Sequence, residues 1–336
     1  MKASDPRPAL LVSFLLFMAA LAAGPLLGPT PLDWSALLAG PSGEGSVDRI
    51  ILFSVRLPRV LTALLSGASL AAAGLVFQTV LRNPLASPYT LGVAGGASLG
   101  AVASFVLPWT AFLPFAPPTI LAAFAGALLS LLLVLGVSAA IRPFSTTTLI
   151  LAGVTANFLF GALVLLLYYT SAPGQGASMM HWLLGGLDVP APGAVPRLAL
   201  SLLPFFLLLL YLGRDLDLLA AGTEWAGTKG VDAGRVSMIA IAGASLLTGA
   251  AVAHTGPIGF IGLLVPHALR PFVGMRHREL LVASAFAGGA FLVFCDAGAR
   301  TLLAPAELPV GILTALLGGP FLLWLLTRMK NPFGAE

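Results

Sequence analysis

Long apolar segments follow one another along almost the whole chain, separated by short polar links. Most are close to 20 residues long, the length that a helix needs to cross the hydrocarbon core of a bilayer. Three of them, the second, third and eighth along the chain, are rich in glycine or interrupted by proline. The pattern predicts an all-α polytopic membrane protein with about ten transmembrane helices, at residues 8–29, 58–81, 90–108, 118–141, 147–170, 193–213, 236–255, 257–273, 280–300 and 309–328.

The first apolar segment follows a short basic start, MKASDPR. Such a start is also typical of a cleaved signal peptide, and LAAG at residues 21–24 would be an acceptable cleavage site. Because many further spans follow without an intervening soluble domain, we favour a first transmembrane helix over a signal peptide.

The composition supports a membrane protein and leaves little room for a soluble domain. Of the 336 residues, 58% are hydrophobic and only 9% are charged, whereas a soluble domain carries about 25% charged residues. We therefore expect a single transmembrane domain over residues 1–336. A net charge of +4 is ordinary for a membrane protein with basic cytoplasmic loops, so it does not indicate nucleic-acid binding. Cys295 is the only cysteine, which excludes an intrachain disulfide and a cysteine metal cluster.

The lysines and arginines predict the orientation in the membrane. If the N-terminus is cytoplasmic, twelve of the 17 Lys and Arg residues fall on the cytoplasmic side, as the positive-inside rule requires. Both termini are then cytoplasmic. Five arginines remain on the outer side and need another explanation: Arg49, Arg56, Arg59, Arg197 and Arg300.

Two stretches indicate an internal repeat. SGASLAAAG at residues 66–74 is similar to AGASLLTGA at residues 242–250. Each lies in a span that a glycine- and proline-broken segment follows, and in the predicted topology the two spans run in opposite directions. This is the signature of an inverted repeat. The alternative is chance similarity among small residues in a chain with 38 glycines.

The two broken segments, at residues 82–100 and 254–271, raise a question of backbone hydrogen bonding. Proline removes a donor and glycine loosens a helix. Broken backbone at membrane depth survives only where it is buried in protein or lines a wet cavity, and small residues also let helices approach closely. The segments are therefore candidates for the walls of a transport pathway or for close packing, with the following residues in either role: Asn83, Pro84, Gly92, Gly96, Gly256, Gly259 and Pro266.

The chain holds no energy source of its own. GTEWAGTKG at residues 222–230 is no phosphate loop, because the lysine is not followed by Ser or Thr. Asp296 is the one acid expected within a span, with Glu307 just beyond it. Asp296 lies four residues before Arg300, so an ion pair on one helix face is favoured over a proton relay. The four histidines lack metal-binding spacing, so no metal site is expected.

The longest cytoplasmic loop spans residues 214–235. Its glycines predict two short helices with a turn. Its length and its apolar side chains, Leu216, Leu218 and Leu219, indicate a docking surface for a cytoplasmic partner. The alternative is a solvated linker.

An ordered set of motifs resembles one family. The motifs are RLPRVLTALLSGASLAAAG (56–74), QTVLRNPLASPYTLGVAGGASLGA (78–101), HWLLGGL (181–187), GPIGFIGLLVPHALR (256–270), HREL (277–280), DAGAR (296–300) and ELPVGILTALLGGPFLLWLL (307–326). In this order they resemble the FecCD-type permeases, which are membrane subunits of ATP-binding-cassette (ABC) importers for iron–siderophore complexes, haem and vitamin B12.

The resemblance implies a mechanism and an assembly. It implies ten spans, with spans 2–5 and 7–10 as inverted repeats, in the cytoplasmic (inner) membrane of a bacterium or archaeon. It implies a homodimer with the pathway at its interface, two ATPase subunits that hold ATP and Mg, and a periplasmic or lipid-anchored binding protein outside. This chain itself would hold no cofactor and catalyse no reaction. The expected cargo is an iron chelate, with haem and cobalamin as alternatives. The other alternative is an ion-coupled carrier or channel.

The resemblance also assigns residues. It implies that Arg56, Arg59 and Arg300 face outward and pair with acids of the binding protein, which suits the forked guanidinium. It places an ATPase coupling surface in the 214–235 loop. Thr223 stands where the family commonly has an acid, and Lys229 replaces a leucine. The coupling residues are Leu219, Gly222, Thr223, Glu224, Ala226 and Gly230.

Overall fold

The computed structural model describes residues 6–33, 45–107, 117–141 and 146–328, and these residues form helices and links without a strand. The helices are α1 (Arg7–Ala23), α3 (Gly45–Ile50), a π-helical segment (Ile51–Arg56), α4 (Leu57–Val80), a 3₁₀ turn (Pro88–Leu91), α5 (Val93–Val106), α6 (Pro118–Ala140), α7 (Thr146–Thr170), α8 (Gln175–Leu183), α9 (Ala194–Tyr211), α10 (Gly213–Ala221), α11 (Thr223–Thr228), α12 (Ala233–Thr255), α13 (Ile261–Val273), α14 (His277–Thr301) and α15 (Val310–Arg328).

The structure confirms a polytopic helical protein but not the number of ten spans. Seven helical segments are long and apolar enough to cross a bilayer. The other three predicted spans correspond to α1, α5 and α13, which have 17, 14 and 13 residues and are shorter than the roughly 20 residues that a span requires. Helix α8 was not predicted as an element.

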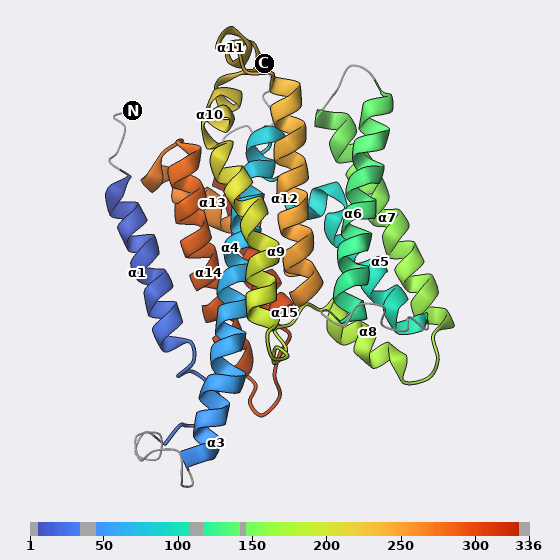
Figure 1. Cartoon of the computed structure of the whole chain (residues 1–336), viewed down its shortest axis with the longest axis vertical. Helices are drawn as coiled ribbons and strands as arrows, with labels where there is room; N and C mark the ends of the chain where they lie inside the picture. Colours follow the sequence, from blue (N-terminus) through green and yellow to red (C-terminus); the bar gives the residue numbers. More distant parts are fainter. Residues whose placement is uncertain (1–5, 34–44, 108–116, 142–145, 329–336) are drawn as a thin grey trace.

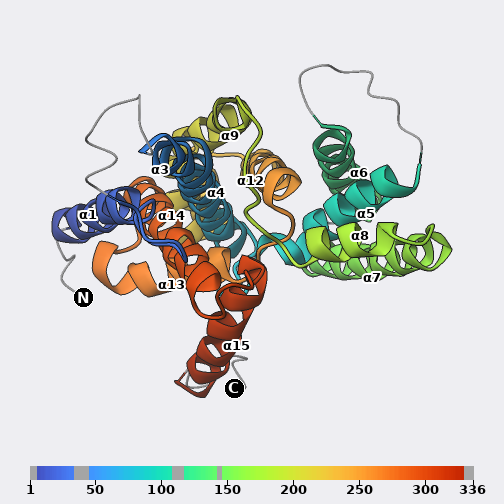
Figure 2. The same cartoon turned by 90° about the horizontal axis from the view of Figure 1, so that it is seen from below.

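Helix α4 lies in the middle of one group of helices, and a second group stands beside it. Helices α1, α9, α12 and α14 surround α4, whereas α5, α6, α7 and α8 form the second group (Figure 2). Helices α10 and α11 lie at one end of the molecule and α3 at the opposite end (Figure 1). We refer to these as the α10 end and the α3 end.

Glycine lets the central helices approach to backbone contact. Helices α4 and α14 share the most extensive contact among the described helices, and the backbones of Gly67 and Gly288 meet there. Gly74 of α4 meets Gly262 of α13 in the same way, so that a Cβ on Gly74 would overlap the partner backbone. Such contacts between small residues are a main source of helix association in membranes, where lipid weakens the hydrophobic driving force.

Side chains bind the backbone groups that the broken segments release. Pro266 lies inside α13 and has no N–H to donate to the carbonyl of Gly262, four residues earlier. The amide of Gln78 donates to that carbonyl instead, at 3.1 Å, and to the carbonyl of Leu263 at 3.3 Å. In the other broken segment, the side-chain amide of Asn157 donates to the carbonyl of Tyr89. The broken backbone is thus buried in protein and hydrogen-bonded, as membrane depth requires.

The two broken segments occupy equivalent places in the order of helices. Long α4 is followed by a break and by short α5, and long α12 is followed by a break at residues 256–260 and by short α13. Helix α4 runs from the α3 end to the α10 end, and α12 runs the opposite way (Figure 1).

Gly74→Ala tests the backbone contact between α4 and α13. The added methyl group meets the Gly262 backbone, which cannot give way as a flexible side chain can. We expect a loss of about 1–3 kcal/mol in the free energy of unfolding, as for overpacked interiors. The measurement is unfolding of the purified protein in detergent. Gly136→Ala in α6 is the matched control, since nothing lies within 4 Å of a Cβ at that position. Equal stability of the two variants would contradict the proposed contact.

Candidate functional site: two polar networks and a short helical hairpin

A cluster of four charged side chains lies at the α3 end, where α4, α14 and the link before α15 meet. Arg59 donates through Nε to Oδ1 of Asp296 at 3.0 Å and through Nη1 to Oε2 of Glu307 at 2.8 Å. Nε of Arg300 lies 3.0 Å from Oδ2 of Asp296. We call Arg59, Asp296, Arg300 and Glu307 the Asp296 cluster. The predicted ion pair between Asp296 and Arg300 is present.

Arg56 and Arg300 also bind the link that follows α1. The Arg56 guanidinium donates to the carbonyl of Pro25 at 3.3 Å and to Oγ1 of Thr30 at 2.9 Å. Arg300 donates through Nη1 to the carbonyl of Leu27 at 2.9 Å. The two guanidinium groups therefore anchor this link against α4 and α14.

The three arginines that the sequence assigns to a docking surface are buried in this chain. Arg56, Arg59 and Arg300 all lie at the α3 end, and each has partners within the chain. The most accessible member of the Asp296 cluster is Glu307, whose side chain is 47% exposed, compared with 1% for Asp296. Glu307 therefore covers Arg59 from the outside.

Helices α10 and α11 form a hairpin at the α10 end, which confirms the prediction of two short helices in the 214–235 loop. Gly222 joins them with φ 137° and Gly230 follows α11 with φ 78°, both in the region that favours glycine. Trp225 is 55% exposed, and the ammonium of Lys229 lies 5.4 Å from the centre of its ring.

Apart from the exposed Trp225, the large apolar side chains of the hairpin face the protein. Leu216, Leu219 and Ala226 are buried in the core and Leu218 packs against it, so the prediction that Leu216, Leu218 and Leu219 form a docking stripe was wrong. The physical reason is that a helix of nine residues needs an apolar face of its own to pack on the spans. The exposed residues of α11 include Thr223, Glu224 and Trp225.

A second polar network, which the sequence did not reveal, ties this hairpin to the spans. Asp217 of α10 accepts hydrogen bonds from Nδ1 and from the backbone N–H of His277, both at 2.7 Å. Oγ1 of Thr79, near the end of α4, lies 2.7 Å from Nε2 of the same imidazole. Burial alone would raise the pKa of Asp217, but the hydrogen bonds from His277 lower it below its ordinary value. The three residues are separated by 60 and 198 positions in the chain, so no local spacing signals their contact.

Three of the seven residues predicted for a pathway or for packing lie at close contacts. Gly92 has φ 77° and lies against Ser130, and Gly96 meets the backbone of Gly126 in α6. Gly256 has φ 65° and meets the carbonyl of Trp182. These contacts indicate packing at three of the seven positions.

The other four positions differ from one another. Asn83 forms an Asx turn, in which its Oδ1 accepts a hydrogen bond from the backbone N–H of Leu85 at 2.9 Å. Pro266 is buried inside α13. Pro84 lines a cavity of about 320 Å³ beside His277, and Gly259 has open space where a Cβ would lie.

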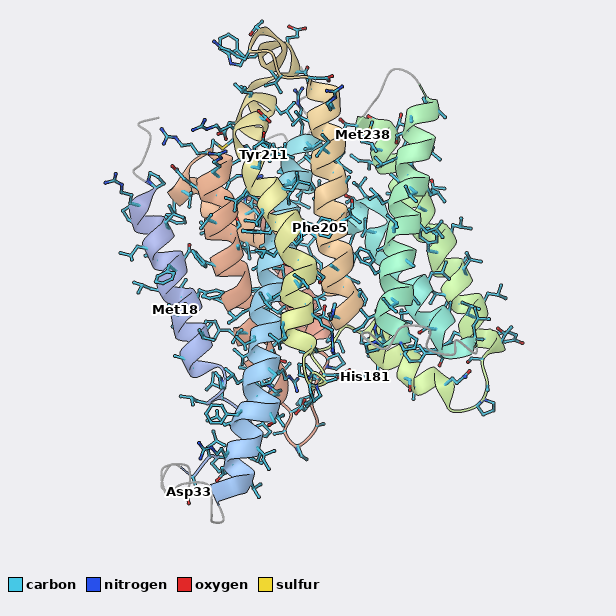
Figure 3. The ribbon with its side chains drawn as sticks, in the orientation of Figure 1. Met18, Asp33, His181, Phe205, Tyr211 and Met238 are labelled. Carbon is cyan, nitrogen blue, oxygen red and sulfur yellow. The ribbon has the colours of Figure 1, made fainter. Side chains whose placement is uncertain are left out.

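A cavity of about 720 Å³ lies between the two groups of helices, with walls from α6, α9 and α12. Phe205 of α9 points into this region (Figure 3). Its walls are mainly apolar, with Asp188, Arg197 and His254 as the charged or titratable lining residues. None of the seven predicted pathway residues lines it. Among the residues that the structure describes, no three His, Cys, Asp or Glu side chains gather as a metal site.

Asp296→Asn tests the Asp296 cluster. The change keeps the side-chain shape but leaves two buried guanidinium groups without their shared carboxylate, so we expect a loss of about 3–5 kcal/mol in the free energy of unfolding. The matched control is Glu279→Gln on the same helix, where the partner Arg276 is 76% exposed; this should cost less than about 1 kcal/mol. Thermal unfolding in detergent measures both. A cost for Asp296→Asn as small as that of the control would mean that the cluster does not hold α4 to α14.

Comparison with known proteins shows which proteins this chain is similar to. The chain is 42% identical, over 88% of its length and 79% of the relative, to the cobalamin import system permease protein BtuC of Halobacterium salinarum. It is 40% identical to the Fe(3+) dicitrate transport system permease protein FecD of Escherichia coli, covering 90% of this chain and 93% of that one. A solved structure described as an inward-facing conformation of a metal-chelate type ABC transporter matches 97% of this chain and 100% of its own, with a TM-score of 0.83 and 30% identity.

The family model agrees with these relatives. The model of the FecCD transport family matches residues 11–328, which include both polar networks and the α10–α11 hairpin. This chain therefore belongs to the FecCD transport family.

Proposed function

We propose that this chain is the membrane permease subunit of an ABC importer that carries a metal chelate, with an iron chelate as the first candidate. The observation that carries this proposal is the family match over residues 11–328, together with similarity to permeases named for cobalamin and for iron dicitrate. Cobalamin and haem remain the alternative cargoes. The chain catalyses no reaction itself, and a separate subunit supplies ATP hydrolysis.

In this proposal the α10 end is cytoplasmic and the ATPase subunit docks on the α10–α11 hairpin. Two features support this placement. The hairpin extends beyond the spans at one end of the molecule (Figure 1). It also offers the exposed Thr223, Glu224 and Trp225 on a base that packs on the spans through Leu219 and Ala226. Both ATP and Mg would be held by the partner, and this chain would transmit the motion.

We also infer ten membrane spans arranged as an inverted repeat, within a homodimer. The equivalent order of α4–α5 and α12–α13, in opposite directions, supports the repeat. A repeat of this kind implies that α5 and α13 are short spans. Helices α7 and α15 support the dimer: they are apolar, but only 28% and 22% of their most apolar windows are buried in this chain, so a second copy and lipid would cover the remainder.

The outer binding protein is the partner proposed for the α3 end. Because Arg56, Arg59 and Arg300 are buried and already have partners, incoming carboxylates would have to compete with groups of this chain. Competition is easiest at the Arg59–Glu307 pair, since Glu307 is half exposed and lies on a link rather than in a helix. We infer that docking acids take the place of Glu307 on Arg59.

The Asp296 cluster argues against the alternative of a proton-coupled carrier. A proton relay needs a carboxylate that can release and regain its charge during transport. Asp296 instead forms ion pairs with both Arg59 and Arg300 at 3.0 Å, so its carboxylate is engaged in joining α4 to α14.

Reconstitution tests the importer proposal. We expect liposomes that contain this chain, its ATPase and its binding protein to accumulate one of three cargoes, ferric siderophore, haem or cobalamin, only when ATP is supplied. Omission of ATP and replacement of ATP by a non-hydrolysable analogue are the controls. Uptake that ignores ATP but responds to an imposed proton or sodium gradient would contradict the proposal and favour a secondary carrier.

Glu307→Gln tests the docking proposal. Removing the competing carboxylate should increase the affinity for the binding protein threefold or more, which corresponds to about 0.7 kcal/mol and is the usual scale of an exposed ion pair. Affinity is measured on immobilised permease at low and high salt. Glu279→Gln, at the opposite end of α14, is the control and should leave the affinity unchanged. A lower affinity for Glu307→Gln would mean that Glu307 itself contributes to docking.

A further inference from the structure

The network of Asp217, His277 and Thr79 joins three elements at one point. Asp217 belongs to α10, His277 is the first residue of α14 and Thr79 lies near the end of α4. His277 is 3% exposed, and its hydrogen-bond distances to both neighbours are 2.7 Å. A buried imidazole with a partner on each side is fixed in direction as well as in position.

The hydrogen-bonding capacity of the three groups determines where the protons lie. The Asp217 carboxylate accepts from the backbone N–H of His277 and can only accept from the ring, so Nδ1 of His277 carries a proton. Nε2 then accepts from the Thr79 hydroxyl. If Nε2 is protonated as well, the hydroxyl accepts from it and donates to the carbonyl of Leu75, which lies 2.9 Å away. The chain of hydrogen bonds is complete in both cases, so it acts as a permanent link.

The remaining contacts between α10 and the spans are mostly apolar and less directional. Leu216 and Leu219 pack in the core, and Arg82 donates to the carbonyl of Leu219 at a long 3.4 Å. The hydrophobic effect is non-directional, whereas short hydrogen bonds weaken steeply when their geometry changes. His277 is therefore the group that fixes the register of α10 against the spans.

The two helices that His277 joins form one unit from end to end. Gly67 and Gly288 bring α4 and α14 into backbone contact near the middle. The Asp296 cluster joins the same two helices at the α3 end, where Arg59 binds Asp296. Arg59 and Thr79 are 20 residues apart on α4, which corresponds to about 30 Å along a helix, or roughly the thickness of the hydrocarbon core.

We propose that His277 is a positioning residue that locks α10 to both α4 and α14, so that a displacement of the α10–α11 hairpin moves these two spans as one body. This inference rests on the proposed role of the hairpin as the ATPase contact. His277 touches neither ATP nor cargo. It determines how much of the motion of the hairpin reaches the spans.

The link has two arms: the hydrogen bond from His277 to Asp217 and the hydrogen bond between His277 and Thr79. Three variants separate them. Thr79→Val removes the hydroxyl and keeps the shape, so it cuts only the arm to α4. His277→Asn places an amide nitrogen near the position of Nδ1, so it retains the arm to Asp217 and loses the arm to Thr79. His277→Ala removes both side-chain arms and leaves only the hydrogen bond from the backbone N–H of residue 277 to Asp217. The matched control is His181→Ala, which removes an exposed histidine whose Nε2 lies 3.0 Å from Asp188. His181 belongs to α8 and lies far from α10 (Figure 3).

The first readout is the number of ATP molecules hydrolysed per cargo molecule imported by the full reconstituted complex. We expect His277→Ala to keep its hydrolysis rate within about twofold and to lose at least tenfold in uptake, so that this ratio rises about tenfold. Thr79→Val and His277→Asn should raise the ratio by about threefold, and His181→Ala should leave it unchanged. A ratio within twofold of the unmodified protein in all variants would overturn the proposal, as would hydrolysis and uptake that fall together.

The second readout is hydrogen–deuterium exchange of the α10 amides in the permease alone, which does not depend on transport. We expect these amides to exchange at least tenfold faster in His277→Ala than in the unmodified protein or in His181→Ala. Unchanged exchange would overturn the proposed lock even if transport were impaired. A different outcome is faster exchange in His277→Ala together with no ATP-driven uptake by the complex of the unmodified protein. This would refute the proposed importer function, and the link would have a structural role only.

Discussion

The close contact between α4 and α14 is the constraint on which the rest of this structure depends. In lipid the hydrophobic effect contributes little to helix association, so the attraction between two helices must come from tight packing and polar contacts. This pair has both. Gly67 and Gly288 allow backbone contact near the middle, the Asp296 cluster joins the helices at one end, and His277 and Thr79 join them at the other. Helices α1, α12 and α13 then pack against one or both members of the pair.

The two breaks in the helices are also stabilised by hydrogen bonds within the protein. Breaks after α4 and after α12 release carbonyls and amides that lipid could not satisfy. Gln78 binds the carbonyl that Pro266 leaves free, and Asn157 binds the carbonyl of Tyr89. Each break is thus held by a side chain from a neighbouring helix.

Sequence reasoning succeeded where the signal is local and failed where it is tertiary. Apolar length located seven helices that can cross a bilayer and three shorter apolar helices. Glycine spacing predicted the α10–α11 hairpin, and the four-residue spacing predicted the Asp296–Arg300 pair. Arg59, which also binds Asp296, is 237 positions away from it, and no periodicity could predict this contact. The burial of Arg56, Arg59 and Arg300 was missed for the same reason, since their partners come from the link after α1 and from α14. Leu216 and Leu219 were assigned to a surface because an apolar stripe looks the same whether it faces a partner or its own chain.

If the α10–α11 hairpin drives transport, α4 and α14 should move with it as one body. A pair of structures of the whole reconstituted complex, one without nucleotide and one with a non-hydrolysable ATP analogue, would show this motion. We expect α4 and α14 to superpose as a single unit in both, with the Arg59–Asp296 and Thr79–His277 contacts intact, while their position relative to α6 and α7 changes. Sliding of α4 along α14, or separation of α10 from His277 on nucleotide binding, would contradict this expectation.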